Sequence, residues 1–264
     1  MPAERAGRLG VGTVGAGRVG AVLAASLAGA GHALTGIATV SEASRERAAA
    51  ILPSVPVLPI PDVVERSELV LLAVPEAELE ALVAGLADAG VWQPGQIVLH
   101  TAARYGTGVL GPALRAGAIP LAVHPAMSFT GTSIDLARLP GTWFAVTAPA
   151  PVLPIGQALV VEMGGEPFVV AEGDREAYGE AIDTAVSFSS AIVDQASGLL
   201  DGIGVRRPGS VLAPLVRSAV ENALSRHDPG PLIDATGTID EAGPIDAAGT
   251  IDEAGPDRPL GGGV

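Results

Sequence analysis

Short apolar segments alternate with alanine-rich segments from residue 9 to about residue 123. We interpret the apolar segments as strands, over residues 9–14, 33–39, 55–59, 69–74, 96–101 and 119–123. The intervening segments predict helices near residues 18–29, 42–51, 76–88 and 107–116. Strands that are apolar at nearly every position are buried on both faces. The alternation therefore predicts an α/β fold with a doubly wound, mostly parallel sheet.

The pattern continues once more and then changes. Residues 143–147, 152–163 and 167–170 predict a further strand, helix and strand. Two helices, over 173–203 and 211–224, then follow without a strand between them. We therefore predict an α/β domain over residues 8–170 and a smaller all-helical domain over residues 171–228.

The end of the chain is a tandem repeat of low complexity. Residues 234–245 and 246–257 are two twelve-residue copies, rich in Gly, Asp and Pro. A solenoid needs about three or more stacked units with an apolar face. We therefore interpret residues 229–264 as a disordered acidic tail.

Composition excludes several classes of protein and site. The sequence has no Cys and no Lys, which excludes thiolate chemistry, Schiff bases and a P-loop lysine. The net charge of −14, without basic clusters, argues against nucleic acid. Because we find neither a signal peptide nor a membrane span, we expect a cytoplasmic protein. The four histidines show no metal-ligand spacing, so no metal site is predicted.

A glycine-rich motif follows the first predicted strand and opens the first predicted helix. It consists of Gly15, Ala16, Gly17, Arg18, Val19 and Gly20. In this G-x-G-x-x-G pattern the first glycine allows a tight turn, and Gly17 allows the backbone to approach a pyrophosphate. Gly20 allows the helix to pack against the strand, and the helix N-terminus attracts the phosphates. The motif predicts dinucleotide binding; the alternative is a glycine-rich junction without a ligand.

The end of the second predicted strand favours NADP over NAD. NAD sites usually place an acidic residue there, to bind the ribose 2′-hydroxyl. Here Thr39 and Val40 are not acidic, whereas Ser41, Ser44 and Arg45 could surround a 2′-phosphate. Glu42 is the main argument against this assignment. Alternatively, Ser41 only caps the next helix while Ser44 and Arg45 are solvated.

Four segments together resemble a known family. They are GAGRVG at 15–20, VLLAVPE at 70–76, HTA at 100–102 and HPAMSFTGT at 124–132. The sequence resembles Rossmann-like proteins that carry the domain of unknown function 2520. That family is similar to ketopantoate reductase and pyrroline-5-carboxylate reductase. The resemblance extends from about residue 8 to residue 226, and it implies a Rossmann domain followed by a helical dimerisation domain.

The resemblance also implies residues of the cofactor site. It places Ala73, Val74 and Pro75 beside the nicotinamide ribose, and we add Thr101 at the end of the strand over 96–101. Small residues and proline at a strand's carboxyl end let a ring approach the backbone. The alternative is a strand simply stopped by Pro75. A homodimer is expected, because the helix face over 177–200 would otherwise leave apolar side chains exposed.

His124 is our candidate for proton transfer, because it follows a predicted strand and no lysine is available. Ser128 and Thr130 could hydrogen-bond a substrate oxygen, and Arg104 could anchor a carboxylate. Alternatively, His124 only bonds a backbone carbonyl. We predict an NADP-dependent oxidoreductase acting on a small carbonyl, imine or hydroxy compound.

The long helix departs from the family at the positions that face the cofactor in relatives. Relatives tend to have a Tyr-His pair and a later His or Asn, whereas Tyr178 is followed by Gly179. The later positions are Thr184, Ser187 and Phe188. These departures support the alternative of a non-catalytic NADP-binding sensor or accessory protein.

Overall fold

The computed structural model describes residues 8–227. Within them one sheet has the strand order β2-β1-β3-β4-β5-β6-β7. Its strands are β1 (Gly10–Val14), β2 (Ala33–Ala38), β3 (Leu69–Leu72), β4 (Ile97–His100), β5 (Ile119–Pro125), β6 (Trp143–Thr147) and β7 (Glu166–Val169). The β5–β6 pair is antiparallel and every other pair is parallel. The prediction of a mostly parallel sheet is confirmed.

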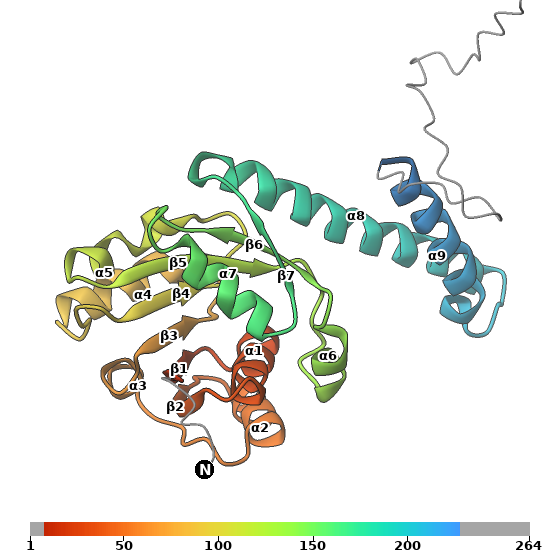
Figure 1. The fold of residues 1–264 in the computed structure, drawn as a ribbon. Coiled ribbons are helices and arrows are strands. Elements are labelled where there is room, and N and C mark those ends of the chain that lie inside the picture. The colour runs from red at the N-terminus through yellow and green to blue at the C-terminus, as the bar shows by residue number, and fades with distance from the viewer. Residues whose placement is uncertain (1–7, 228–264) are drawn as a thin grey trace, which may run out of the picture. The chain divides into compact units, whose positions relative to one another are not determined.

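Helices connect the strands and continue the chain after the sheet (Figure 1). The α-helices are α1 (Arg18–Gly29), α2 (Glu42–Ile51), α3 (Ile60–Glu65), α4 (Glu76–Asp88), α5 (Gly111–Arg115), α6 (Ser133–Arg138), α7 (Leu153–Glu162), α8 (Arg175–Gly202) and α9 (Pro208–His227). Two short 3-10 helices are η1 (Thr107–Leu110) and η2 (Glu172–Asp174). The predicted all-helical region after the sheet is thereby confirmed.

Both faces of the sheet are covered, as its composition requires. All four residues of β3 and of β4 are buried. One apolar cluster joins the sheet to α1 and α7, and a second joins the other face to α3 and α4. The core is built mainly from Ala, Val, Leu and Ile, so the low aromatic content is no obstacle to a doubly wound fold.

One predicted strand is wrong. Residues 55–59 form no strand, and their sheet pairing is a single bridge between Ile37 and Val57. Pro53, Pro56 and Pro59 lack the backbone N–H that a continuous ladder needs. The segment instead leads into α3, a short helix that the sequence analysis missed along with α6.

The described chain divides into two compact units within α8, after Ser190. The sheet, its covering helices and the start of α8 belong to the first unit, and the rest of α8 and α9 belong to the second. The predicted domain limits at residues 170/171 and 228/229 stay predictions, and the acidic tail over 229–264 lies outside the described residues. Between residues 8 and 227, no helix has the length and apolarity needed to cross a membrane.

Candidate functional site

The phosphate turn, residues 15–20, connects β1 to α1. Gly15 has a φ of +100°, a conformation that favours glycine, and its N–H donates to the Ala38 carbonyl at 2.9 Å. Gly17 is the N-cap of α1, and no side chain caps this end of the helix. The first turn of α1 also contains no acidic residue. The helix terminus therefore offers its amide hydrogens to an anion.

The three glycines of the turn have different surroundings. A Cβ at Gly20 would overlap the Gly15 carbonyl oxygen and approach the Ala73 Cβ to 2.9 Å. At Gly17, by contrast, an added Cβ would meet only the Ala73 carbonyl oxygen, at 4.0 Å. Gly20 is thus required by internal packing. Because the protein does not fill the space beside Gly17, that space remains open for a phosphate.

The turn lies where the strand order reverses. The chain runs from β1 to β2 on one side and returns to β3 on the other side of β1. Ala73, Val74 and Pro75 follow β3 directly, and the Ala73 N–H donates to the Val14 carbonyl at 2.8 Å. Ligands of open α/β sheets bind at the carboxyl ends of strands at such a reversal. The structure therefore brings the phosphate turn and residues 73–75 together.

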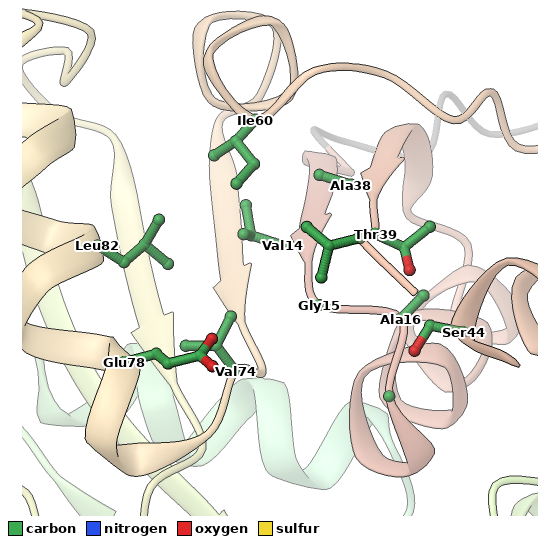
Figure 2. A pocket seen from close by; sticks show the side chains of 12 residues that line it. Val14, Gly15, Ala16, Ala38, Thr39, Ser44, Ile60, Val74, Glu78 and Leu82 are labelled. Carbon is green, nitrogen blue, oxygen red and sulfur yellow. The ribbon is translucent and has the colours of Figure 1, made fainter. Parts of the chain in front are cut away.

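A cavity of about 130 Å³ opens on one side of the turn (Figure 2). Its walls are mainly apolar, with Val14 and Ala38 from the sheet and Ile60 and Leu82 from α3 and α4. Thr39 and Ser44 lie on one side, and the Glu78 carboxylate lies opposite them. The Thr39 Oγ1 is buried and has no hydrogen-bond partner. A flat apolar slot edged by a few polar groups suits a nucleoside.

The residues predicted to surround a 2′-phosphate lie at the edge of this cavity. Ser41 is the N-cap of α2: its Oγ accepts the Ser44 N–H at 3.2 Å and lies 2.8 Å from the Ser44 Oγ. Arg45 donates to the Val40 carbonyl at 3.1 Å, which places its guanidinium at the end of β2. Capping and an available cation therefore coexist here, and no carboxylate follows β2 before Glu42.

Two further arginines lie at the phosphate turn. Arg47 of α2 donates to the Ala16 carbonyl at 3.3 Å. Gly131, in the loop after β5, packs so closely on Arg47 and Arg18 that a Cβ would lie 2.6 Å and 2.8 Å from their side chains. The buried Asp135 carboxylate fixes this loop by accepting the Gly131 N–H at 2.7 Å. No motif in the sequence pointed to Arg47.

A second cavity, of about 330 Å³, opens on the other side of the turn. It is lined by Gly17, Arg18, Val19, Ala73, Val74, Pro75, Glu76, Thr101, Ala102, Ala103, His124, Ile182 and Asp183. Gly17 and Val74 line both cavities. The two cavities therefore meet at the phosphate turn, as the two halves of a dinucleotide meet at its pyrophosphate.

His124 is paired with a tyrosine of α8. Its Nδ1 lies 2.8 Å from the Tyr178 hydroxyl, and the two rings meet edge to face with centroids 5.5 Å apart. Burial, and then the charge of Arg175, lower the pKa of His124 from 6.5 to about 4, although Asp183 acts in the opposite direction. The imidazole is thus neutral near pH 7.

Arg175, at the start of α8, is almost fully buried, with 1% of its surface exposed. Its guanidinium donates to the Thr147 Oγ1 at 2.7 Å and to the Ala122 and Ala145 carbonyls at 2.8 and 3.0 Å. Within residues 8–227 it forms no salt bridge. Burial lowers the pKa of Arg175 to about 10, so the side chain remains charged at neutral pH. Arg175 was not among the predicted site residues, although a cation in a helix's first turn opposes the helix dipole and is visible in the sequence.

Two other candidates, His100 and Arg104, form hydrogen bonds within the protein. The His100 Nδ1 accepts the Ala102 N–H at 3.2 Å, so Nε2 donates to the Gly106 carbonyl at 2.8 Å. Burial lowers the pKa of His100 to about 4. Arg104 donates to the Asp183 carboxylate at 2.6 and 3.1 Å. A substrate carboxylate would therefore compete with Asp183 for Arg104.

The remaining candidates divide between the cavity and its surroundings. Thr101 lines the second cavity, whereas Ser128 lies exposed in the loop after β5 and does not line it. Gly179 has a packing reason, because a Cβ would lie 2.9 Å from the Arg104 Cα. Thr184 and Ser187 are exposed. In the part of the chain that the structure describes, no group of three acidic or histidine side chains could hold a metal ion.

Two family models match the sequence. Residues 2–125 match the Rossmann-like domain. Residues 142–237 match the domain of unknown function DUF2520. The recognition made from the four sequence segments is therefore confirmed, and no curated protein sequence matches this chain.

Solved structures share the fold at low sequence identity. A 1-pyrroline-5-carboxylate reductase from Streptococcus pyogenes is 17% identical with a TM-score of 0.61, over 84% of this chain and 80% of that one. An imine reductase from Myxococcus stipitatus in complex with NADP+ is 16% identical with a TM-score of 0.58, over 83% and 77%. A semialdehyde dehydrogenase NAD-binding protein from Cupriavidus necator, in complex with calcium and NAD, is 16% identical with a TM-score of 0.58, over 87% and 88%.

Proposed function

Because residues 2–125 match the Rossmann-like domain and residues 142–237 match the DUF2520 domain, we propose that this protein is an NADP-dependent oxidoreductase of a small carbonyl, imine or hydroxy compound. The observation that carries the proposal is the meeting of two cavities at Gly17. One cavity has the apolar walls of a nucleoside site, and the other is lined by His124 and other polar groups. Similar folds occur in proteins described as an imine reductase and a pyrroline-5-carboxylate reductase.

The residues of the turn and cavities fit a dinucleotide. The α1 terminus and Arg18 would hold the pyrophosphate, and the partnerless Thr39 hydroxyl would face the adenosine ribose. Ser41, Ser44 and Arg45 would surround the 2′-phosphate, which is why we propose NADP rather than NAD. When bound, a nicotinamide supplies or accepts a hydride at the substrate carbon.

The chain's own residues would position the substrate beside the nicotinamide. Residues 73–75 and Thr101 form one wall of the second cavity, and Ile182 of α8 contributes an apolar wall. His124 lines the same cavity and is the titratable group best placed for a reacting oxygen or nitrogen. Ser128 retains a role only if its exposed loop moves when substrate binds.

Cofactor binding can be tested by substituting glycines of α1. In Gly17→Ala the new methyl group occupies the phosphate approach without meeting protein atoms closer than 4.0 Å. We expect NADPH affinity, measured by fluorescence titration, to fall roughly tenfold or more, about 1.4 kcal/mol. Gly29→Ala is the matched control, because a Cβ there meets nothing within 4 Å. Absence of NADPH binding by the wild-type protein at millimolar concentration would overturn the proposal.

A non-catalytic NADP-binding protein is the second candidate. The observation that favours it is that Thr184 and Ser187, at positions where relatives carry His or Asn, do not line the second cavity. Tight NADPH binding without hydride exchange, across panels of aldehydes, ketones, imines and alcohols, would select this function over an enzyme.

We also propose that the protein is a homodimer through its helical region. Large apolar side chains of the second unit are exposed, among them Ile192 at 61%, Leu199 at 70% and Leu224 at 63%. Exposed apolar surface of this kind commonly marks a protein interface. Sedimentation at micromolar concentration tests the proposal, and a stable monomer would contradict it.

A further inference from the structure

Within residues 8–227 Arg175 forms no salt bridge, and Glu172 acts on its charge only at longer range. Its guanidinium also reaches the carbonyl of Ala103, a residue that lines the second cavity. Its three shortest hydrogen bonds reach oxygens of β5 and β6, which pair through His124 and Ala145. A buried cation without a carboxylate partner is costly, so a fold rarely keeps one without a use for it. To satisfy these oxygens of β5 and β6, a side chain needs hydrogen-bond donors but no charge.

The guanidinium is linked to His124 through Tyr178. The Arg175 Cζ lies 5.7 Å from the centroid of the Tyr178 ring, and the Tyr178 hydroxyl bonds the His124 Nδ1. Phe168 also packs against the tyrosine, edge to face, with ring centroids 6.0 Å apart. These contacts hold the phenol at the imidazole. We refer to Arg175, Tyr178 and His124 as the β5–α8 cluster.

Burial and the nearby cation decide which group of this pair donates. Burial raises the pKa of the Tyr178 hydroxyl, which keeps the phenol protonated, and the charge of Arg175 opposes part of that rise. The same charge opposes protonation of the imidazole. The favoured arrangement therefore has the Tyr178 hydroxyl donating to Nδ1, with the proton of the neutral imidazole on Nε2. Within residues 8–227, Nε2 has no hydrogen-bond partner, and His124 lines the second cavity. The free donor is thus available to a ligand there.

We propose that Arg175 is a positioning residue that keeps Tyr178 and His124 as a neutral relay, with the imidazole Nε2–H offered to a carbonyl oxygen of the substrate. The inference rests on the proposed oxidoreductase function. When a hydride, which a bound nicotinamide would supply, forms a C–H bond at the carbonyl carbon, the carbon–oxygen π bond breaks and its electron pair goes to the oxygen. The oxygen then needs one proton. Nε2 gives that proton, Nδ1 takes one from Tyr178, and Tyr178 recovers one from water. The transient phenolate lies beside the guanidinium, which stabilises it.

The same charge disfavours a protonated imine. Such a substrate already carries its proton and a positive charge, so it needs no relay and is repelled by Arg175. The acidic groups of the cavity are engaged elsewhere: Glu76 accepts the Ala103 N–H at 2.6 Å, and Asp183 is paired with Arg104. The charged or titratable groups around His124 are Arg18 on α1, Glu76 on α4, His100 at the end of β4, Arg104 in the loop after it, and Arg175, Tyr178 and Asp183 on α8.

The tautomer of His124 tests the proposal without cofactor or turnover. In protein labelled with ¹⁵N-histidine, we expect neutral His124 above pH 6, protonated on Nε2, with His124→Asn used for assignment. Arg175→Met should raise the pKa of His124, which should stay below 6.5 because burial is the larger cause. Arg175→Lys keeps the charge and should keep the pKa low. A His124 protonated on Nδ1, or an unchanged pKa in folded Arg175→Met, would overturn the proposal.

Tyr178→Phe covers the case in which Arg175→Met does not fold, because Tyr178 is only partly buried. In this variant the His124 Nδ1 resonance should move to the position of a nitrogen without a hydrogen bond. An unmoved His124 Nδ1 resonance counts against the relay. With NADPH, cyclohexanone and other ketones should turn over faster than the matched cyclic imines, and Tyr178→Phe should lower kcat on ketones at least tenfold with unchanged NADPH affinity. Faster imine turnover, or turnover of neither class, overturns the carbonyl assignment. Failure of NADPH binding instead removes the proposed function, whatever the state of the tautomer.

Discussion

The phosphate turn and His124 of the β5–α8 cluster line the same cavity, but the turn and the cluster are built in different ways. The turn is made of backbone from six consecutive residues, and its specificity comes from missing side chains at Gly15, Gly17 and Gly20. The cluster is made of side chains from β5 and α8, and its properties come from burial and from a guanidinium that forms no salt bridge within the described residues.

This difference determines what each region can tolerate. A backbone site depends on close contacts between atoms that cannot move apart, so a single added methyl group is damaging. A buried side-chain site depends on protonation, so its stability and its function change with pH. Substitutions of glycine and changes of pH therefore act on different regions of the molecule.

The largest effect is expected from Gly20→Ala. Its Cβ would overlap the Gly15 carbonyl oxygen, which belongs to the turn itself and cannot move without opening it. We expect a loss of about 3 kcal/mol or more in the free energy of unfolding, measured with urea, together with loss of NADPH binding. Gly17→Ala should retain stability and lose only binding. If Gly20→Ala were as stable as the Gly29→Ala control, the turn would not be held by backbone packing.

The next largest effect is a loss of folding stability in acid, and it comes from two histidines, His124 of the β5–α8 cluster and His100 of β4. Burial lowers the pKa values of both His100 and His124 to about 4. Between pH 6.5 and 4 the unfolded chain therefore binds more protons than the folded chain, so stability is complete above pH 6.5 and falls as the pH drops. For His100 alone the loss approaches roughly 3 kcal/mol at pH 4.

Urea unfolding at a series of pH values measures this loss. His100→Asn is the informative variant, because an amide can keep a bond to the Gly106 carbonyl but does not titrate. A plot of its free energy of unfolding against pH should be flatter between pH 6.5 and 4 than the plot for the wild type. An identical slope in the variant would show that His100 is not held neutral by the fold.

The sequence predicted the backbone region well because its signal is local. The six residues of the turn are contiguous, and strand, turn and helix follow one another in the order that dinucleotide sites require. The apolar runs of β3 and β4 likewise have one physical solution, burial on both faces. The segment at 55–59 misled the prediction because its composition is apolar, while Pro56 and Pro59 within it and Pro53 just before it prevent a continuous ladder.

The side-chain region was predicted only in part because its partners are distant in the sequence. His124 could be placed at a strand end, but its contact with Tyr178 spans 54 residues and that of Arg175 with Ala122 spans 53. Ser128 was selected by its neighbourhood in sequence, whereas the direction of the loop after β5 leaves it exposed. Gly179 suggested a lost catalytic position, yet it is explained by the close approach of the Arg104 backbone.

The smallest effect concerns cofactor choice at the end of β2, where side chains extend the backbone site. In Arg45→Ala we expect the ratio of NADPH to NADH affinity to fall about tenfold, near 1.4 kcal/mol, because only NADPH carries the 2′-phosphate. Fluorescence titrations with both cofactors measure this ratio, and Arg115→Ala is the control for the change in net charge, since Arg115 is exposed in α5 and lines neither cavity. Equal losses for both cofactors would place Arg45 at a phosphate that they share. No loss for either would leave Ser41 and Ser44 as the side chains that select the cofactor, and the preference for NADP would then depend on the α2 terminus rather than on a cation.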